Sequence, residues 1–223
     1  MGPFLWPPWP NNIFTSLILL YSLFINPASI LGASSVELSS KTISLETRYQ
    51  VPSVNQVFKD NILLTLNYMS GTVRGKNDVN WENVKKPAQY EFTLNPGERF
   101  AFHDTLLSQY KDGVVKTTNA HFNSSDGFLS DRWLYGDGVC HLASLIHWAA
   151  LDAGLESISL ASHDFARIPE ISREYGVSIK YMPGETANSA RQNLYITNNQ
   201  NVPVTFVFEY DGTNLKVKVV KDL

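Results

Sequence analysis

The stretch GDGVCHLASLIHWAALDAGLE, residues 136–156, decides the fold. Its apolar residues recur every three to four positions, which predicts a helix up to Ala153 with one face buried. Gly136 and Gly138 predict a sharp bend directly before this helix, so Cys140 falls in its first turn. Gly154 marks its end. The apolar stripe consists of Leu142, Leu145, Ile146, Ala149 and Ala153.

After Gly154 the apolar residues alternate with polar ones, and this period of two is typical of strands. Asp211-Gly212 predicts a tight turn that joins the last two strands as a hairpin. The expected strands cover residues 157–162, 178–182, 193–197, 204–210 and 215–220.

Before the bend, residues 53–70 have helical spacing, with Ser53 and Gln56 in a capping-box pattern. Residues 71–88 are expected to form a loop. Short strands are expected at 90–94 and 99–102, around the turn Asn95-Pro96-Gly97, and a long irregular stretch follows over 103–135. This order favours an α+β fold, in which the helix that carries Cys140 packs on a mostly antiparallel sheet.

The N-terminal region differs in composition from the folded domain that follows it. Residues 13–25 are an apolar run, and the wider stretch is long enough to cross a bilayer, although no Lys or Arg precedes Lys41. We therefore expect residues 1–33 to be a signal peptide or a membrane anchor, 34–52 a polar linker and 53–223 the domain. The protein is then exported and extracytoplasmic, either secreted or held at the membrane.

Composition excludes some classes of function. The net charge is −3, and no clustered basic face indicates a nucleic-acid partner. Cys140 is the single cysteine, so no disulfide can form within the chain. The histidines show no zinc-type spacing around it, and neither a metal nor another cofactor is expected.

Cys140 is the residue most suited to chemistry, because a helix N-terminus favours negative charge on sulfur and offers amide donors to an oxyanion. A cysteine nucleophile needs a base, and His163, at the end of an expected strand, is the best candidate. The group that orients the imidazole is open among Glu185, Asp164 and Asn188, and Glu185 is our choice. The expected substrate contacts are Gly136, Gly138, His141, Ser144 and Tyr181.

Each of these residues also has a purely structural interpretation. Cys140 fits the role of a small buried residue, and His163 could simply hydrogen-bond a carbonyl group. His141 lies about 100° around the helix from Cys140 and His147 two turns further on, so both are poor bases for it.

At these residues the chain resembles the VanW-like family, named for an accessory protein of glycopeptide-resistance clusters. The family's glycine run, Val-Cys and Ala-Gly-Leu-Glu motifs match residues 136–156, and its Pro-Gly-Glu-x-Phe-x-Phe phrase matches residues 96–102. Its His motif matches residues 162–164, its Tyr-x-Pro phrase residues 181–183, and its closing strand residues 194–198. The resemblance covers roughly residues 60–223.

The resemblance implies an envelope location and an association with peptidoglycan, but no settled reaction. The order of a Cys helix followed by a His strand is also that of papain-like and transglutaminase-like enzymes. The chain departs from the family at His141, where glutamine is usual, and at Asp137, which replaces a glycine. The family's Asp-Ala pair is Thr186-Ala187 here, and the segment 165–176 is longer than usual.

Two hypotheses follow. In the first, the protein is a cysteine-nucleophile hydrolase or acyl transferase that acts on a cell-wall peptide or a related amide. In the second, it is a non-catalytic accessory domain that binds envelope peptide or glycan through its long loop. The loop residues suited to such a groove are Tyr110, His121, Phe122, Phe128, Trp133 and Tyr135.

Overall fold

The computed structural model describes Gly2, residues 35–132 and residues 135–222, so the expected signal or anchor over 1–33 lies outside the described residues. Within those residues the fold is α+β, as expected, with two four-stranded sheets that are mostly antiparallel, and four α-helices. No helix in these ranges is both long enough and apolar enough to cross a membrane. The papain-like or transglutaminase-like arrangement is not confirmed.

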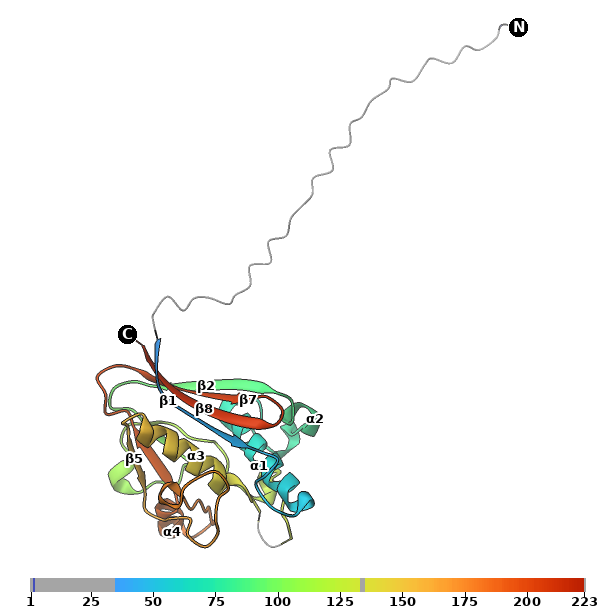
Figure 1. Ribbon diagram of the computed structural model, residues 1–223. Helices are drawn as coiled ribbons and strands as arrows, with labels where there is room; N and C mark the ends of the chain where they lie inside the picture. Colours follow the sequence, from blue (N-terminus) through green and yellow to red (C-terminus); the bar gives the residue numbers. More distant parts are fainter. Residues whose placement is uncertain (1, 3–34, 133–134, 223) are drawn as a thin grey trace. The chain divides into compact units, whose positions relative to one another are not determined.

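The first sheet has the order β1-β8-β7-β2, and all its neighbours are antiparallel (Figure 1). It contains β1 (Ser35–Ser44), β8 (Asn214–Asp222), β7 (Val204–Tyr210) and β2 (Ala88–Leu94). The hairpin of β7 and β8 around Asp211-Gly212 confirms the turn expected from the sequence.

The second sheet has the order β4-β3-β6-β5, and its one parallel pair is β3 with β4. It contains β4 (Val114–Lys116), β3 (Arg99–Ala101), β6 (Leu194–Thr197) and β5 (Glu156–Ser159). The strands β2 and β3 flank the turn at 95–97 as expected, but they belong to different sheets, so this turn is the corner between the two.

The helices are α1 (Pro52–Ser70), α2 (Trp81–Val84), α3 (Val139–Asp152) and α4 (Thr186–Arg191). Helix α3 contacts β1 and β8 of the first sheet and β5 and β6 of the second, so it is the central helix of the domain. Its fully buried residues include Leu142, Leu145, Ile146 and Ala149, which confirms the expected apolar stripe.

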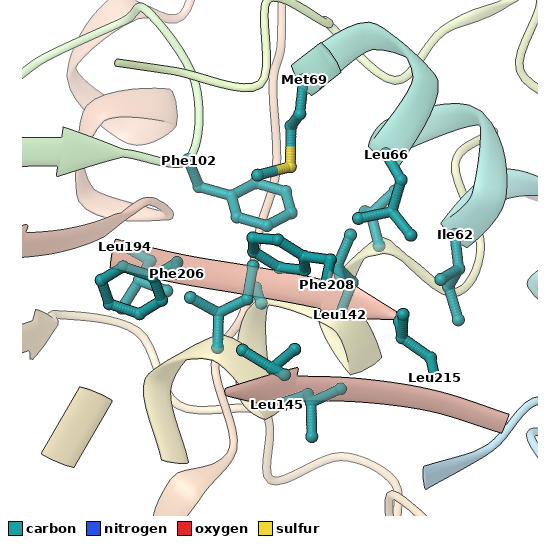
Figure 2. Close-up of a cluster of buried hydrophobic side chains, with 14 of the residues drawn as sticks. Ile62, Leu66, Met69, Phe102, Leu142, Leu145, Leu194, Phe206, Phe208 and Leu215 are labelled. Atoms are coloured by element: carbon teal, nitrogen blue, oxygen red, sulfur yellow. The ribbon is translucent and has the colours of Figure 1, made fainter. Parts of the chain in front are cut away.

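One core joins these layers. Figure 2 shows Ile62, Leu66 and Met69 of α1 opposite Phe206 and Phe208 of β7. Leu142 and Leu145 of α3 lie in the same cluster. Because the apolar faces of α1, α3 and the sheets meet in one place, the start of α3 is held by packing on several sides.

The linker expected over 34–52 is wrong, because β1 occupies much of it and pairs with β8 along its whole length. Ile43 and Leu45 are fully buried, and so is the Arg48 side chain. The Arg48 guanidinium donates to the carbonyl oxygens of Ser44 and Pro169. A strand rich in Ser and Thr with one exposed face looks like a polar linker in the sequence alone.

Two smaller expectations also fail. Helix α1 begins at Pro52 after Val51 without a side-chain cap, and Gln56 donates to Asp60 instead of closing a capping box. Residues 178–182 form no strand. Their N–H groups bond to separate partners, with Ser178 N donating to Ala161 O and Lys180 N to Gln192 O, so no ladder forms.

The stretches expected to be irregular carry short elements. Residues 71–88 contain α2 and a 3₁₀ turn, Lys76–Asp78. Residues 103–135 contain β4 and two 3₁₀ turns, Ser108–Tyr110 and Ser124–Asp126. This loop is therefore locally structured, as long loops in compact domains usually are.

The bend before α3 brings its backbone against α1. Gly138 has φ +96°, and a Cβ there would lie 2.5 Å from the carbonyl oxygen of Phe58. Gly154, at the other end of α3, has a similar φ of +75° with nothing within 4 Å of a Cβ. Both positions require a left-handed backbone, but only Gly138 also requires the absence of a side chain.

We expect Gly138→Ala to lower the free energy of unfolding by about 2–4 kcal/mol, because backbone strain and a clash add together. Gly154→Ala, the matched control, should cost about 1–2 kcal/mol from strain alone. Urea denaturation of both variants measures the difference, and equal losses would show that the approach to Phe58 is not tight.

Candidate functional site

Cys140 lies in the first turn of α3 and lines a cavity of about 580 Å³. We call this the cysteine pocket. Its wall is largely aromatic and apolar, and it comes from α1, the loop before α3 and the segments after β5. The lining residues used below are Phe58, His121, Asp137, Cys140, His141, His163, Phe165, Ile179 and Tyr181.

The glycines before Cys140 shape this pocket from the backbone. A Cβ at Gly136 would lie 2.8 Å from both the Cβ and the carbonyl oxygen of Phe122. The buried Asn61 of α1 fixes the same bend, because its amide donates to the carbonyl oxygens of Leu129 and Asp137. Gly136 and Gly138 also line the pocket, but close packing already requires a glycine at both positions.

The Cys140 thiol is hydrogen-bonded to the backbone of Ile179. Its sulfur accepts from the Ile179 N–H at 3.4 Å and donates to the Ile179 carbonyl at 3.6 Å. Burial raises the pKa of Cys140 to about 11, against the opposing effect of the N–H groups of Ile179 and of Cys140 itself. The resting thiol is therefore protonated at neutral pH.

His163 lies in the wall of the same pocket, with its side chain buried. Its Nδ1 is 3.2 Å from the carbonyl oxygen of Ala166, an oxygen that can only accept, so Nδ1 carries the proton and Nε2 is left with a free lone pair. The ring of Phe165 packs on it with centroids 4.0 Å apart. Burial lowers the pKa of His163, so the imidazole is neutral at pH 7.

Cys140 and His163 share the pocket without a direct hydrogen bond among the described residues. Each sulfur bond goes to Ile179. The ring of His141 lies next to His163, with centroids 6.0 Å apart, and also contacts Phe58. Cys140 and His163 therefore share one pocket, each with a backbone partner of its own.

His141 also lines the pocket, but its ring is buried and Nδ1 has no hydrogen-bond partner in the described part of the chain. Burial lowers its pKa to about 3, and the positive charge of Arg48 acts in the same direction. His141 therefore stays neutral and is a poor proton acceptor.

The remaining expected site residues lie elsewhere or have structural roles. Glu185 precedes α4, is exposed, and accepts from the side chain of Asn188, and neither residue lines the pocket. Asp164 is exposed and also lies outside the lining. Ser144 is buried and joins α3 to the next segment, since it donates to Cys140 O and accepts from Val177 N.

His121 and Tyr181 also line the pocket, and their ring centroids are 4.3 Å apart. The Nε2 of His121 is 3.1 Å from the Asp104 carboxylate, and its Nδ1 is 3.7 Å from that of Asp126. Tyr181 was an expected contact, whereas His121 was expected only as a loop aromatic. The carboxylates that hold His121 come from the fold of the loop and have no sequence signal near it.

Of the other loop residues named for a binding groove, Phe122 and Tyr135 also line the pocket. Phe128 is in the core, and Tyr110 packs against Tyr195. Trp133 lies outside the described residues. Within the described ranges, no three or more His, Cys, Asp or Glu side chains are grouped so as to hold a metal ion.

Asp137, between the two glycines, is the acidic group that acts on the thiol. Burial raises its pKa to about 6, with a further contribution from the negative charge of Asp131. Above this value Asp137 is charged, and its charge contributes to the raised pKa of Cys140. The charge of Asp137 therefore disfavours the Cys140 thiolate.

We expect the rate of Cys140 alkylation by iodoacetamide to keep rising with pH towards pH 11, whereas an ordinary cysteine levels off near its pKa of about 8.5. Asp137→Asn should lower the midpoint, because removal of the negative charge favours the thiolate. The measurement is the alkylation rate by mass spectrometry, with circular dichroism at each pH to verify the fold.

Asp112→Asn, which changes an exposed carboxylate outside the pocket lining, is the control and should leave the midpoint unchanged. A midpoint near 8.5 in the unchanged protein would contradict the burial of the thiol.

A model of the VanW-like protein family matches residues 80–220, which is more than half of the chain. This range contains β2, the bend, α3 with Cys140, His163 and the β7–β8 hairpin. No curated protein and no solved structure matches the chain. Because the match covers more than half of the chain, the chain belongs to the VanW-like family.

Proposed function

We propose that the protein is a thiol-dependent enzyme that cleaves or transfers an amide bond of a cell-envelope peptide. The observation that carries this proposal is that Cys140, in the first turn of α3, and His163, in the loop after β5, line one pocket, and that His163 Nε2 has no hydrogen bond to any described residue. That tautomer is the one a general base needs.

In the first step, Cys140 Sγ attacks the amide carbonyl carbon while its proton moves to His163 Nε2. The S–C bond forms, the C–N bond breaks, and the leaving amine takes the proton from His163. Water then attacks the thioester in hydrolysis, or a second amine in transfer, and the thiol is restored. The Ala166 carbonyl orients the imidazole, the role that the sequence suggested for a carboxylate.

Backbone N–H groups beside the sulfur support the charged intermediates. The N–H groups of Val139 and His141 are already bonded to the carbonyls of Gly136 and Gly138, so they are poor oxyanion donors. The N–H of Ile179 points at the sulfur, and that of Cys140 also acts on it. These two donors can stabilise the thiolate and then the oxyanion that forms next to it.

Because the pKa of Cys140 is raised, the thiol loses its proton only after the substrate has bound. At neutral pH almost no thiolate exists at rest, so the thiol is protected from random oxidation and alkylation. If a substrate carbonyl group displaces Ile179 from the sulfur, the thiol can attack that carbonyl while its proton moves to the imidazole of His163. The mechanism therefore has the character of general-base catalysis rather than of a preformed ion pair.

The pocket suits an extended peptide. Its volume of about 580 Å³ holds several residues, and its rings offer flat apolar faces with a few polar groups between them. The apolar run over residues 13–25 supports an exported protein, secreted or anchored outside the cytoplasm. A peptide of the cell wall is then the substrate class available in that location.

The test is conversion of purified peptidoglycan fragments by the full-length protein, followed by mass spectrometry. We expect Cys140→Ala to abolish conversion and His163→Gln to lower its rate by roughly 10²- to 10⁴-fold, the usual contribution of a general base. His147→Gln is the matched control: His147 is on α3 but outside the pocket, bonded to Ser157, and its loss should not slow the folded enzyme.

The second candidate is a non-catalytic envelope-binding domain, and the thiol bonded to Ile179 with its raised pKa favours it. In that case the aromatic rings of the pocket bind the ligand, and Cys140 has only a packing role. Binding of peptidoglycan that survives Cys140→Ser, is lost in Tyr181→Ala, and occurs without any conversion of fragments would establish this function in place of the enzyme.

A further inference from the structure

A second cavity, of about 350 Å³, lies inside the loop between His163 and Gly176. We call it the loop cavity. The loop closes on itself, because His163 N donates to Gly176 O and Ser162 pairs with Val177 beyond it.

Two arginines line the loop cavity without an ion pair in the described part of the chain. Arg167 and Arg173 line it, are exposed, and have no ion pair among the described residues. Glu170 also lines it, but its carboxylate is held by the buried Arg48 at 2.8 Å and accepts from the Ser44 N–H. Two arginines are therefore left to attract an anion.

The loop is held in place before any ligand arrives. The Arg48 guanidinium ties Pro169 and Glu170 to the end of β1, and Ile168 and Ile171 are buried beneath. Glu170 adopts φ +68°, a strained backbone for a residue with a side chain, and its bonds to Arg48 and Thr47 stabilise it there. A preformed cavity loses little entropy when it binds.

His163 lines both cavities, so the two adjoin at this residue. We propose that the loop cavity binds a carboxylate group of the same peptide whose amide bond reaches Cys140, an inference that rests on the proposed function. Guanidinium groups match the planar carboxylate with paired hydrogen bonds, which distinguishes it from a neutral amide. Asp164 and Glu174 lie in the loop but outside the lining and do not occupy these arginines.

The test compares three probes by NMR titration of the full-length protein: N-acetyl-alanyl-alanine with a free C-terminal carboxylate, the same peptide as its C-terminal amide, and inorganic phosphate. We expect the carboxylate peptide to shift the amides of residues 163–176 and to bind at least about tenfold more tightly than the amide. The double variant Arg167→Gln/Arg173→Gln should lose that preference. Arg74→Gln, an exposed arginine outside both linings, should keep it.

Equal affinity for the two peptides, an unchanged preference in the double variant, or no shift of the loop amides would overturn the proposal. Loop shifts with phosphate alone would also overturn it, in favour of a phosphate source. The enzyme proposal can fail separately. A carboxylate preference without any conversion of peptidoglycan fragments would contradict the enzyme proposal but support the loop cavity as a carboxylate site. Conversion of the fragments without a carboxylate preference would contradict only the proposal for the loop cavity.

Discussion

The contact between the Gly138 backbone and the Phe58 backbone is the constraint on which the rest of the site depends. With 2.5 Å between a Cβ at 138 and the Phe58 carbonyl oxygen, α3 can start here only from glycine. The contact joins α1 to the central helix, and the shared core behind it holds both helices against the sheets (Figures 1 and 2). The position of the Cys140 sulfur follows directly from this start.

Everything around the sulfur comes from segments that this helix start brings together. Asn61 fixes the bend from α1, Ile179 faces the thiol from the segment after the loop, and Ser144 ties that segment to α3. His163 arrives with the same segment, because the loop between it and Gly176 is closed by a backbone bond. The site is thus a product of packing between distant parts of the chain, and burial governs its acid–base behaviour.

The sequence predicts the parts of this fold in which local pattern and burial agree. Helix α3 has an apolar stripe at helical spacing, and β7 and β8 alternate on either side of an Asp-Gly turn, so these elements were recognised. Strand β1 was missed because it is rich in Ser and Thr and its burial depends on β8, far away in the sequence. The segment 178–182 alternates like a strand, yet its N–H groups bond to four different residues, Ala161, Cys140, Gln192 and Ser189.

The candidate site divides in the same way. Cys140 and His163 could be named because residue type and neighbouring elements already suggest their chemistry, and both line the pocket. The group that bonds His163 Nδ1 could not be predicted from the sequence, because every peptide unit has a carbonyl. Only the fold of the loop turns the carbonyl of Ala166 towards Nδ1. Glu185 was chosen by residue type, but its position before α4 takes it out of the lining.

Covalent capture of the substrate tests the central claim, that Cys140 is a nucleophile served by His163. The full-length protein, incubated with peptidoglycan fragments and quenched in acid, can be digested and its peptides examined by mass spectrometry. A thioester on the peptide that contains Cys140, present in the unchanged protein and greatly reduced in His163→Gln, is the predicted result. Conversion of the fragments by a Cys140→Ala protein, or an unmodified Cys140 during rapid conversion, would contradict it.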